Sequence, residues 1–108
     1  METVCTKVRL KPGSLGRVRE WTTELRTRSD EVLATLRDEG VVIESVFLDS
    51  DERGDFLVYY MKAQSLGEAH AVVQSSPHPI DSYHQHFKVD TWQSRTPLEL
   101  LVDFENFS

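Results

Sequence analysis

The chain has 108 residues, of which 39% are hydrophobic and 28% are charged, so we expect one globular domain over residues 1–108. A net charge of −6 argues against a nucleic-acid partner, which would require a basic surface. No apolar run reaches the roughly 18 residues of a membrane-spanning helix.

The N-terminus and the single cysteine favour a cytoplasmic protein. Met1 to Val4 lack the basic and apolar stretches of a secretory signal, and Cys5 has no second cysteine with which to pair. Basic and acidic residues alternate over residues 17–39, which is typical of a solvated helix face rather than a membrane-binding surface.

The first third of the chain predicts a strand and a long helix. Residues 4–10 alternate between apolar and polar side chains, as in a half-buried strand, and the Lys-Pro-Gly of residues 11–13 ends it. We expect Ser14 to cap a helix that ends at Gly40. Its apolar stripe weakens over residues 26–30, where the helix is expected to kink.

The middle of the chain predicts a hairpin and a second helix. Residues 41–49 and 56–63 are rich in β-branched and aromatic side chains and flank a polar turn that contains Gly54. Ser65 and Glu68 form a capping-box pattern, which predicts a helix to about Ser75.

The last third predicts a short helix and a fourth strand. Pro79 suits the first turn of a helix, with Ile80, Tyr83, His84 and Phe87 on one side. Residues 88–97 are expected to be irregular. Residues 98–104 alternate again and predict the fourth strand.

This order of elements, β-α-β-β-α-β, predicts a ferredoxin-like α+β fold. Its four-stranded antiparallel sheet carries both helices on one face and leaves the other face bare. Because nothing else in the chain is expected to cover that face, we expect a homodimer through the open sheet face.

The stretch Pro77-His78-Pro79, the aromatic segment through Phe87 and the ending Thr96-Pro97-Leu98-Glu99-Leu100-Leu101 resemble the dimeric α+β barrel superfamily. Its members include monooxygenases, chlorite dismutase-like haem proteins, muconolactone isomerases and polyketide cyclases. Within it, the chain is most similar to an uncharacterised family of small single-domain proteins. The resemblance implies a pocket between the helices and the sheet.

One branch of that superfamily carries a His-Pro-x-His motif whose second histidine acts with an upstream tyrosine. His78 and Pro79 match this motif, whereas Asp81 stands at the second histidine and Ser75 at the tyrosine. The resemblance therefore implies the pocket of that branch without its catalytic pair.

The histidine-rich segment does not predict a metal site. His84 and His86 lie two residues apart, about 200° around a helix, so their rings face apart. His78 and His86 would lie about 12 Å apart along a helix, too far for one ion. We expect neither a metal nor a cofactor.

His84 is the candidate acid–base residue, because an imidazole titrates near neutral pH. It would be the polar group in an apolar wall, and the alternative is a structural histidine at the helix–sheet junction. Tyr59 and Tyr60 face opposite sides of their strand, and the sequence does not decide which faces the cavity. The expected ligand-binding residues are Tyr59, Tyr60, His78, Tyr83, His84, Phe87 and Trp92.

These features predict a homodimer whose protomers each enclose an apolar cavity for a small hydrophobic molecule, fatty-acid-like or aromatic. Whether the protein is an enzyme stays open at this point. One alternative is a cofactor-independent isomerase, cyclase or monooxygenase with His84 as the base. The other is a non-catalytic ligand-binding or structural dimer.

Overall fold

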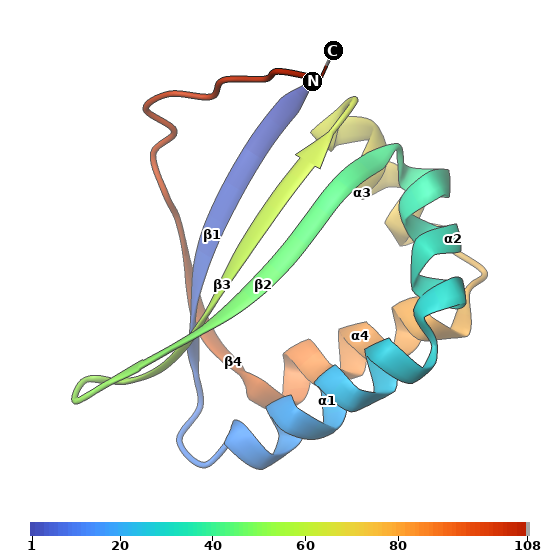
Figure 1. Ribbon diagram of the computed structural model, residues 1–108. Coiled ribbons are helices and arrows are strands. Elements are labelled where there is room, and N and C mark those ends of the chain that lie inside the picture. Colours follow the sequence, from blue (N-terminus) through green and yellow to red (C-terminus); the bar gives the residue numbers. More distant parts are fainter. Residues whose placement is uncertain (108) are drawn as a thin grey trace.

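The computed structural model describes residues 1–107 and confirms the ferredoxin-like fold. Four antiparallel strands form one sheet in the order β2-β3-β1-β4, and the helices gather on one side of it (Figure 1). None of the described helices combines the length and the apolar character needed to cross a membrane. The elements are β1 (Glu2–Leu10), α1 (Leu15–Thr27), α2 (Ser29–Glu39), β2 (Val41–Asp51), β3 (Gly54–Ala63), α3 (Leu66–Gln74), α4 (Pro79–Thr91) and β4 (Trp92–Pro97).

The expected kink in the first helix is a break at Arg28, which separates α1 from α2. The Arg28 guanidinium bonds the carboxylates of Glu24 at 3.3 Å and Glu31 at 2.8 Å and so links the two helices. At the other end of α2, Gly40 has φ 71°, the left-handed conformation in which a glycine commonly ends a helix.

The two expected N-terminal caps have different outcomes. Ser65 Oγ accepts a hydrogen bond from the Glu68 N–H at 3.2 Å, so the predicted cap of α3 is confirmed. The prediction for Ser14 is wrong: its hydroxyl donates to the Lys11 carbonyl at 2.7 Å and caps no helical N–H. Ser14 already has helical backbone angles, which turn its side chain back toward the preceding turn.

The C-terminal prediction is also wrong. Residues 88–97 are regular, because α4 continues to Thr91 and β4 follows directly from Trp92 to Pro97. The expected strand at residues 98–104 is absent from the sheet. The segment at 92–97 already occupies the open edge of β1. Among the described residues beyond it, up to 107, the only backbone bond to the sheet joins Leu98 N–H to the Cys5 carbonyl. Alternation of side chains alone cannot distinguish a paired strand from an extended arm.

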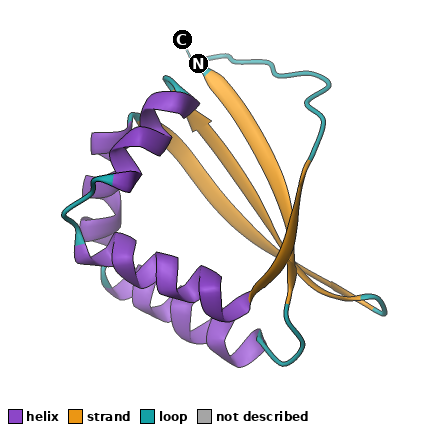
Figure 2. Cartoon of the chain, turned by 180° about the vertical axis from the view of Figure 1, so that it is seen from behind, coloured by secondary structure: helices purple, strands orange, loops and turns teal. Residues whose placement is uncertain are grey.

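The core lies between the helices and the inner face of the sheet, which is the concave side in Figure 2. Trp21 of α1 and Phe87 of α4 stack with centroids 4.3 Å apart and planes 6° apart. They pack on Val8 of β1 and Leu57 of β3. A second cluster joins Val41, Ala63 and Ala69 beneath α2 and α3.

The strand register assigns the remaining side chains to faces. Tyr59 packs in the core cluster, so it lies on the inner face, and its neighbour Tyr60 lies on the outer face. Cys5 is paired with Tyr60 in the register and shares the outer face. Phe47 of β2 also lies on this outer face and is 61% exposed.

Candidate functional site

A cavity of about 390 Å³ lies between the sheet and helices α1, α2 and α4. About half of its lining is apolar and includes Trp21, Leu25, Leu36, Val46 and Ile80. The remaining lining is polar and includes Glu39, Glu44, Asp81, His84, Gln85 and Lys88. The expected apolar wall is therefore only part of the site.

A second compartment of about 870 Å³ continues from this cavity between α3, α4 and the strands β1, β3 and β4. It contains Trp92 and Arg95, with Val4 and Leu66 among its apolar residues. The residues shared by both compartments are Glu39, Met61, Val73, Asp81, Gln85 and Lys88. We call this shared set the waist, and it places two carboxyl groups and one ammonium group at the centre of the space.

His84 lines the cavity, and one of its two ring nitrogens already has a hydrogen-bond partner in the protein. The Trp21 indole N–H donates to Nδ1 of His84 at 3.1 Å, and the two rings stack with centroids 5.6 Å apart. Because an indole nitrogen can only donate, Nδ1 must be unprotonated, and a neutral ring carries its proton on Nε2. Burial, and secondarily the nearby Lys88 ammonium, lowers the pKa of His84 to about 3. At neutral pH, His84 is thus a hydrogen-bond donor.

Glu39, the last residue of α2, has a carboxyl group whose pKa is raised into the neutral range. Burial, followed by the neighbouring charges of Asp81 and Glu44, raises the pKa of Glu39 to about 7. A carboxyl group with this pKa is present in both protonation states at physiological pH. Glu39 can therefore both accept and donate a proton within the cavity.

Glu44 and Lys88 complete the charged set. Burial raises the pKa of Glu44, although the Lys88 ammonium opposes that effect. Burial likewise lowers the pKa of Lys88, with Glu44 opposing and Arg95 adding to the effect. Glu44 lies among the walls of the cavity, yet its side chain keeps accessible surface. The reason is that it points into the open space of the cavity and not against packed atoms.

Asp81 of α4 has a buried oxygen that lacks a partner. Its Oδ2 atom makes no hydrogen bond to any of residues 1–107. An unpaired buried acceptor costs free energy, about 1–3 kcal/mol in typical cases. Since Asp81 lines both compartments, a bound molecule with an O–H or N–H group would supply the missing donor.

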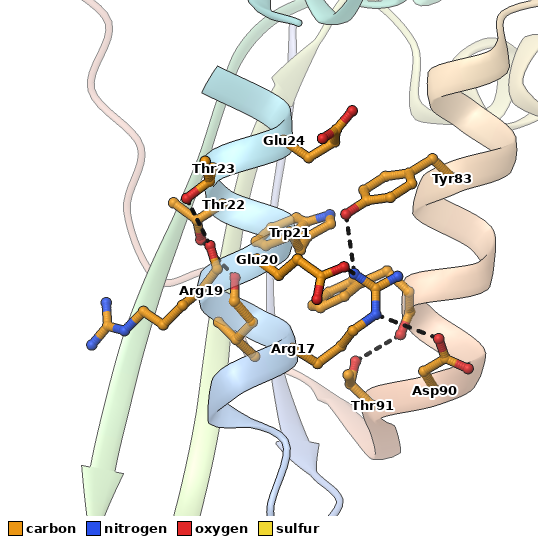
Figure 3. A network of polar contacts seen from close by, with 12 residues as sticks. Arg17, Arg19, Glu20, Trp21, Thr22, Thr23, Glu24, Tyr83, Asp90 and Thr91 are labelled. Atoms are coloured by element: carbon orange, nitrogen blue, oxygen red, sulfur yellow. Dashed lines mark hydrogen bonds and ion pairs between the residues drawn. The ribbon is translucent and has the colours of Figure 1, made fainter. Parts of the chain in front are cut away.

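Tyr83, one of the expected ligand-binding residues, faces α1 rather than the cavity. Its hydroxyl accepts a hydrogen bond from Arg17 at 3.0 Å, and Arg17 also reaches Asp90 at 3.5 Å (Figure 3). The guanidinium lies 5.2 Å from the centroid of the tyrosine ring. Tyr83 thus joins α1 to α4.

The other expected residues are dispersed around the site. Of the expected ligand-binding residues, His84 lines the first compartment and Trp92 lines the second.

The remaining expected residues lie outside the lining. Phe87 is in the core, and His78 pairs with Asp38 at 2.7 Å, which raises the pKa of His78. Tyr59 lies behind the wall, in edge contact with Trp92 at 5.3 Å, and burial raises its pKa. Tyr60 is on the opposite face of the sheet.

Among the charged residues of the cavity that were not expected from the sequence are Glu39, Glu44 and Lys88. Two of them, Glu44 and Lys88, could have been identified from their positions in the sequence. Glu44 interrupts an otherwise apolar inner face of β2, and Lys88 follows His84 by four residues on α4. Glu39 carries no such signal, because it lies at the end of a charged helix and enters the cavity only through the packing of α2.

No group of three or more His, Cys, Asp or Glu side chains suited to a metal ion occurs within residues 1–107. The histidine-rich segment is dispersed as the helical spacing predicts, with His78 at Asp38, His84 at Trp21 and His86 exposed.

Comparisons with solved structures show that the chain shares its fold with known proteins. L-rhamnose mutarotase from Formosa agariphila has a TM-score of 0.65 and 21% identity over 97% of this chain and 100% of its own. An antibiotic biosynthesis monooxygenase-like protein from Nitrosomonas europaea has a TM-score of 0.58 and 14% identity, over 91% and 94% of the two chains. At these identities the similarity establishes the shared ferredoxin-like α+β fold alone.

Comparisons at the sequence level add one match. A family profile described as "Family of unknown function (DUF6176)" matches residues 1–108. A search of curated proteins gives no significant match.

Proposed function

The chain belongs to a family of unknown function, DUF6176, and we propose that it is a homodimer whose protomers bind and isomerise or cyclise a small molecule by cofactor-independent acid–base chemistry. The ligand would have an aliphatic or aromatic body for the apolar wall and at least one hydroxyl or N–H group for the waist. The site would be the cavity between the helices and the sheet.

The observation that carries this proposal is the placement of Glu39 in the waist. A general base or acid works best when its pKa lies near the working pH. The Glu39 carboxyl meets this condition because it is partly buried beside Asp81 and Glu44, and its pKa is raised to about 7. In the proposed reaction the Glu39 carboxylate takes a proton from the ligand and returns it at a second position.

His84 would act beside Glu39 as a hydrogen-bond donor and not as the base. Its Nε2–H would bond a ligand oxygen on which negative charge develops as Glu39 removes the proton. Its Nδ1 is already used by Trp21. The expected role of His84 as the base is therefore reassigned in this proposal.

The apolar wall sets the kind of ligand body. A volume of about 390 Å³ is within the usual range of roughly 300–1,000 Å³ for small-molecule pockets. Trp21, Leu25 and Ile80 offer a flat apolar surface, while the unpaired Asp81 oxygen requires a donor from the ligand. An amphipathic molecule satisfies both requirements.

Two of the expected reaction types fit this set of groups better than the third. Isomerisation and cyclisation need only proton transfer and charge stabilisation, which Glu39 and His84 would supply. Mono-oxygenation would also consume dioxygen as the oxidant. The structural neighbours named as a mutarotase and as a monooxygenase-like protein belong to these different reaction types.

The proposed homodimer rests on the outer face of the sheet, which none of the described helices covers (Figure 1). Phe47 is 61% exposed there, and Tyr60 is half-buried. Both faces of β3 are apolar, as expected for a strand that is covered on both sides. Sheet-to-sheet contact between two copies would bury this face.

A non-catalytic ligand-binding protein is the second candidate. The bond between Trp21 and His84, together with the stack of their rings, supports it, because these contacts give His84 a structural role without any ligand. In that case the waist would select a ligand but transfer no proton.

Proton exchange in deuterated water separates the two candidates. A panel of enolisable aromatic ketones, aliphatic ketones and reducing sugars is followed by NMR with the native protein, Glu39→Gln and the exposed control Glu52→Gln. Catalysed exchange or anomerisation that Glu39→Gln abolishes and Glu52→Gln retains supports the enzyme. Binding detected by native mass spectrometry, with no catalysed exchange for any binding member of the panel, supports the non-catalytic protein.

A further inference from the structure

The second compartment of the cavity differs in charge from the molecule around it. The chain as a whole has a net charge of −6. Beyond the waist, however, the described lining of this compartment contains the cation Arg95 and the histidines His70 and His86, and no carboxylate. Carboxylates reach it only through the waist, as Glu39 and Asp81. The side of the cavity bounded by α3 and β4 is therefore the side suited to an anion.

Arg95 of β4 faces this compartment. It is paired in the register with Val8, a fully buried core residue, and directly paired residues lie on the same face of a sheet. Arg95 is nevertheless exposed, because it faces open space on the inner side. No hydrogen bond or ion pair joins its guanidinium to residues 1–107. Its N–H groups are thus open to a ligand, and their planar arrangement matches the two oxygens of a carboxylate.

Lys88 of α4 approaches the same space from the waist. Its ammonium lies 4.9 Å from the centroid of the Trp92 ring and forms no ion pair within residues 1–107. Burial lowers the pKa of Lys88, while Glu44 opposes this effect and the charge of Arg95 adds to it. An anion in contact with both Lys88 and Arg95 would be attracted by each and would offset their mutual repulsion.

The carboxyl groups of the waist limit the charge of that anion. Asp81 offsets one positive charge, and Glu39, whose pKa is about 7, is ionised for about half of the time at neutral pH. Glu44 lines the first compartment alone. The charges of Lys88 and Arg95 therefore exceed those of the waist by no more than one. This balance favours a singly charged carboxylate over a doubly charged phosphate ester.

We propose that the second compartment is a subsite for a carboxylate group of the ligand, bound by Arg95 and Lys88. This rests on the proposed function and names its ligand class, a small organic acid whose apolar body lies against Trp21 and Ile80 in the first compartment. The waist between them would hold the part of the acid on which Glu39 acts. The carboxylate subsite would thus set the direction in which the ligand enters the cavity.

Isothermal titration calorimetry with phenylbutyrate and its uncharged amide, phenylbutyramide, tests the subsite. The native chain is compared with Arg95→Gln and with the control Arg19→Gln, which removes the same charge from an exposed position of α1 that lines neither compartment. We expect the native chain and the control to bind the acid about tenfold more tightly than the amide. Arg95→Gln should lose most of this preference.

Phenylpropyl phosphate, added to the same series, separates the two kinds of anion. A native chain that binds the acid no more tightly than the amide, whether both bind or neither does, overturns the subsite. A preference for the acid that Arg95→Gln retains in full also overturns it. Tighter binding of the phosphate ester than of the acid overturns the carboxylate as the occupant.

Proton exchange in deuterated water distinguishes a failure of the subsite from a failure of the proposed reaction, because the binding measurement requires no turnover. A preference for the acid that depends on Arg95, without catalysed exchange of any ligand that binds, keeps the subsite and overturns the reaction. Exchange that Glu39→Gln abolishes, in a protein with no preference for the acid over the amide, keeps the reaction and overturns the subsite.

Discussion

The Trp21 indole N–H donates a hydrogen bond to Nδ1 of His84 across the interface of α1 and α4, at 3.1 Å. This one contact fixes the tautomer of the histidine and directs its remaining N–H away from Trp21. It explains why His84, the residue that sequence reasoning favours as a base, is better suited to donate a hydrogen bond. It also makes the stability of the protein depend on an acceptor at position 84.

Replacements of His84 are expected to show how much its hydrogen-bond acceptor contributes to the stability of the fold. His84→Leu leaves the Trp21 N–H without an acceptor in a buried position and should destabilise the fold by about 1–3 kcal/mol. His84→Asn can restore the acceptor with its side-chain carbonyl and should lose less stability. Urea unfolding followed by Trp fluorescence measures both variants. Equal losses would mean that the hydrogen bond contributes little.

Glu39 is expected to make stability fall as pH rises. Its pKa is raised from 4.5 in the unfolded chain to about 7 in the fold, so the folded state binds the proton more tightly. The stabilisation is complete below pH 4.5 and is lost as pH rises through 7. Glu39→Gln should remove this loss. Between pH 4.5 and pH 8 the free energy of unfolding of the variant should therefore gain about 1–2 kcal/mol relative to that of the native protein, after allowance for partial solvation.

His84 has the opposite effect on stability, so the comparison needs both variants. Because its pKa is lowered from 6.5 to about 3, its contribution is present above pH 6.5 and is lost as pH falls toward 3. Between pH 4.5 and 6.5 the two groups oppose each other. Urea titrations of native, Glu39→Gln and His84→Asn proteins over pH 4–8 resolve them. A Glu39→Gln profile parallel to the native one would contradict the raised pKa of Glu39.

The cavity is expected to bind an apolar probe that a larger side chain can displace. Val32 lines the first compartment, whereas its neighbour Leu33 is exposed on the same helix. Val32→Phe should weaken binding of anilinonaphthalene sulfonate by about tenfold, while Leu33→Phe should leave it unchanged. Fluorescence titration gives both constants. Equal binding by both variants would place the probe elsewhere on the molecule.

The stack of Trp21 on Phe87 is expected to dominate the stability of the helix layer. Phe87 is fully buried, and Phe87→Ala should cost about 3–5 kcal/mol through lost burial and the cavity it leaves. Val89→Ala, at an exposed position two residues away, should stay within about 0.5 kcal/mol of the native protein. Thermal unfolding compares them. A loss for Phe87→Ala no larger than that for Val89→Ala would contradict the assigned core.

Hydrophobic periodicity predicts most of this fold because each element buries one face. The alternation in β1 and β3 and the stripe through Ile80 and Phe87 identify strands and helix correctly. The same signal fails at residues 98–104, because β4 at residues 92–97 already pairs with the edge of β1 that this alternating segment was expected to occupy.

The candidate site was predictable only in part. The sequence brings out His84 through its spacing to Ile80 and Phe87, and the cavity does contain it. Glu39 lies on a helix that reads as solvated, and its position in the waist follows from the break at Arg28 and the packing of α2. A single sequence carries no signal for a carboxyl group whose burial depends on the angle between two helices.

The titration of Glu39 tests the central claim most directly, because it requires no knowledge of the ligand. Protein labelled with ¹³C at the glutamate side-chain carboxyl is titrated by NMR from pH 3 to pH 9, and Glu39→Gln identifies the resonance. We predict a midpoint near 7 for Glu39. A midpoint near 4.5, the ordinary glutamate value, would contradict the proposal that Glu39 is the acid–base group of the cavity.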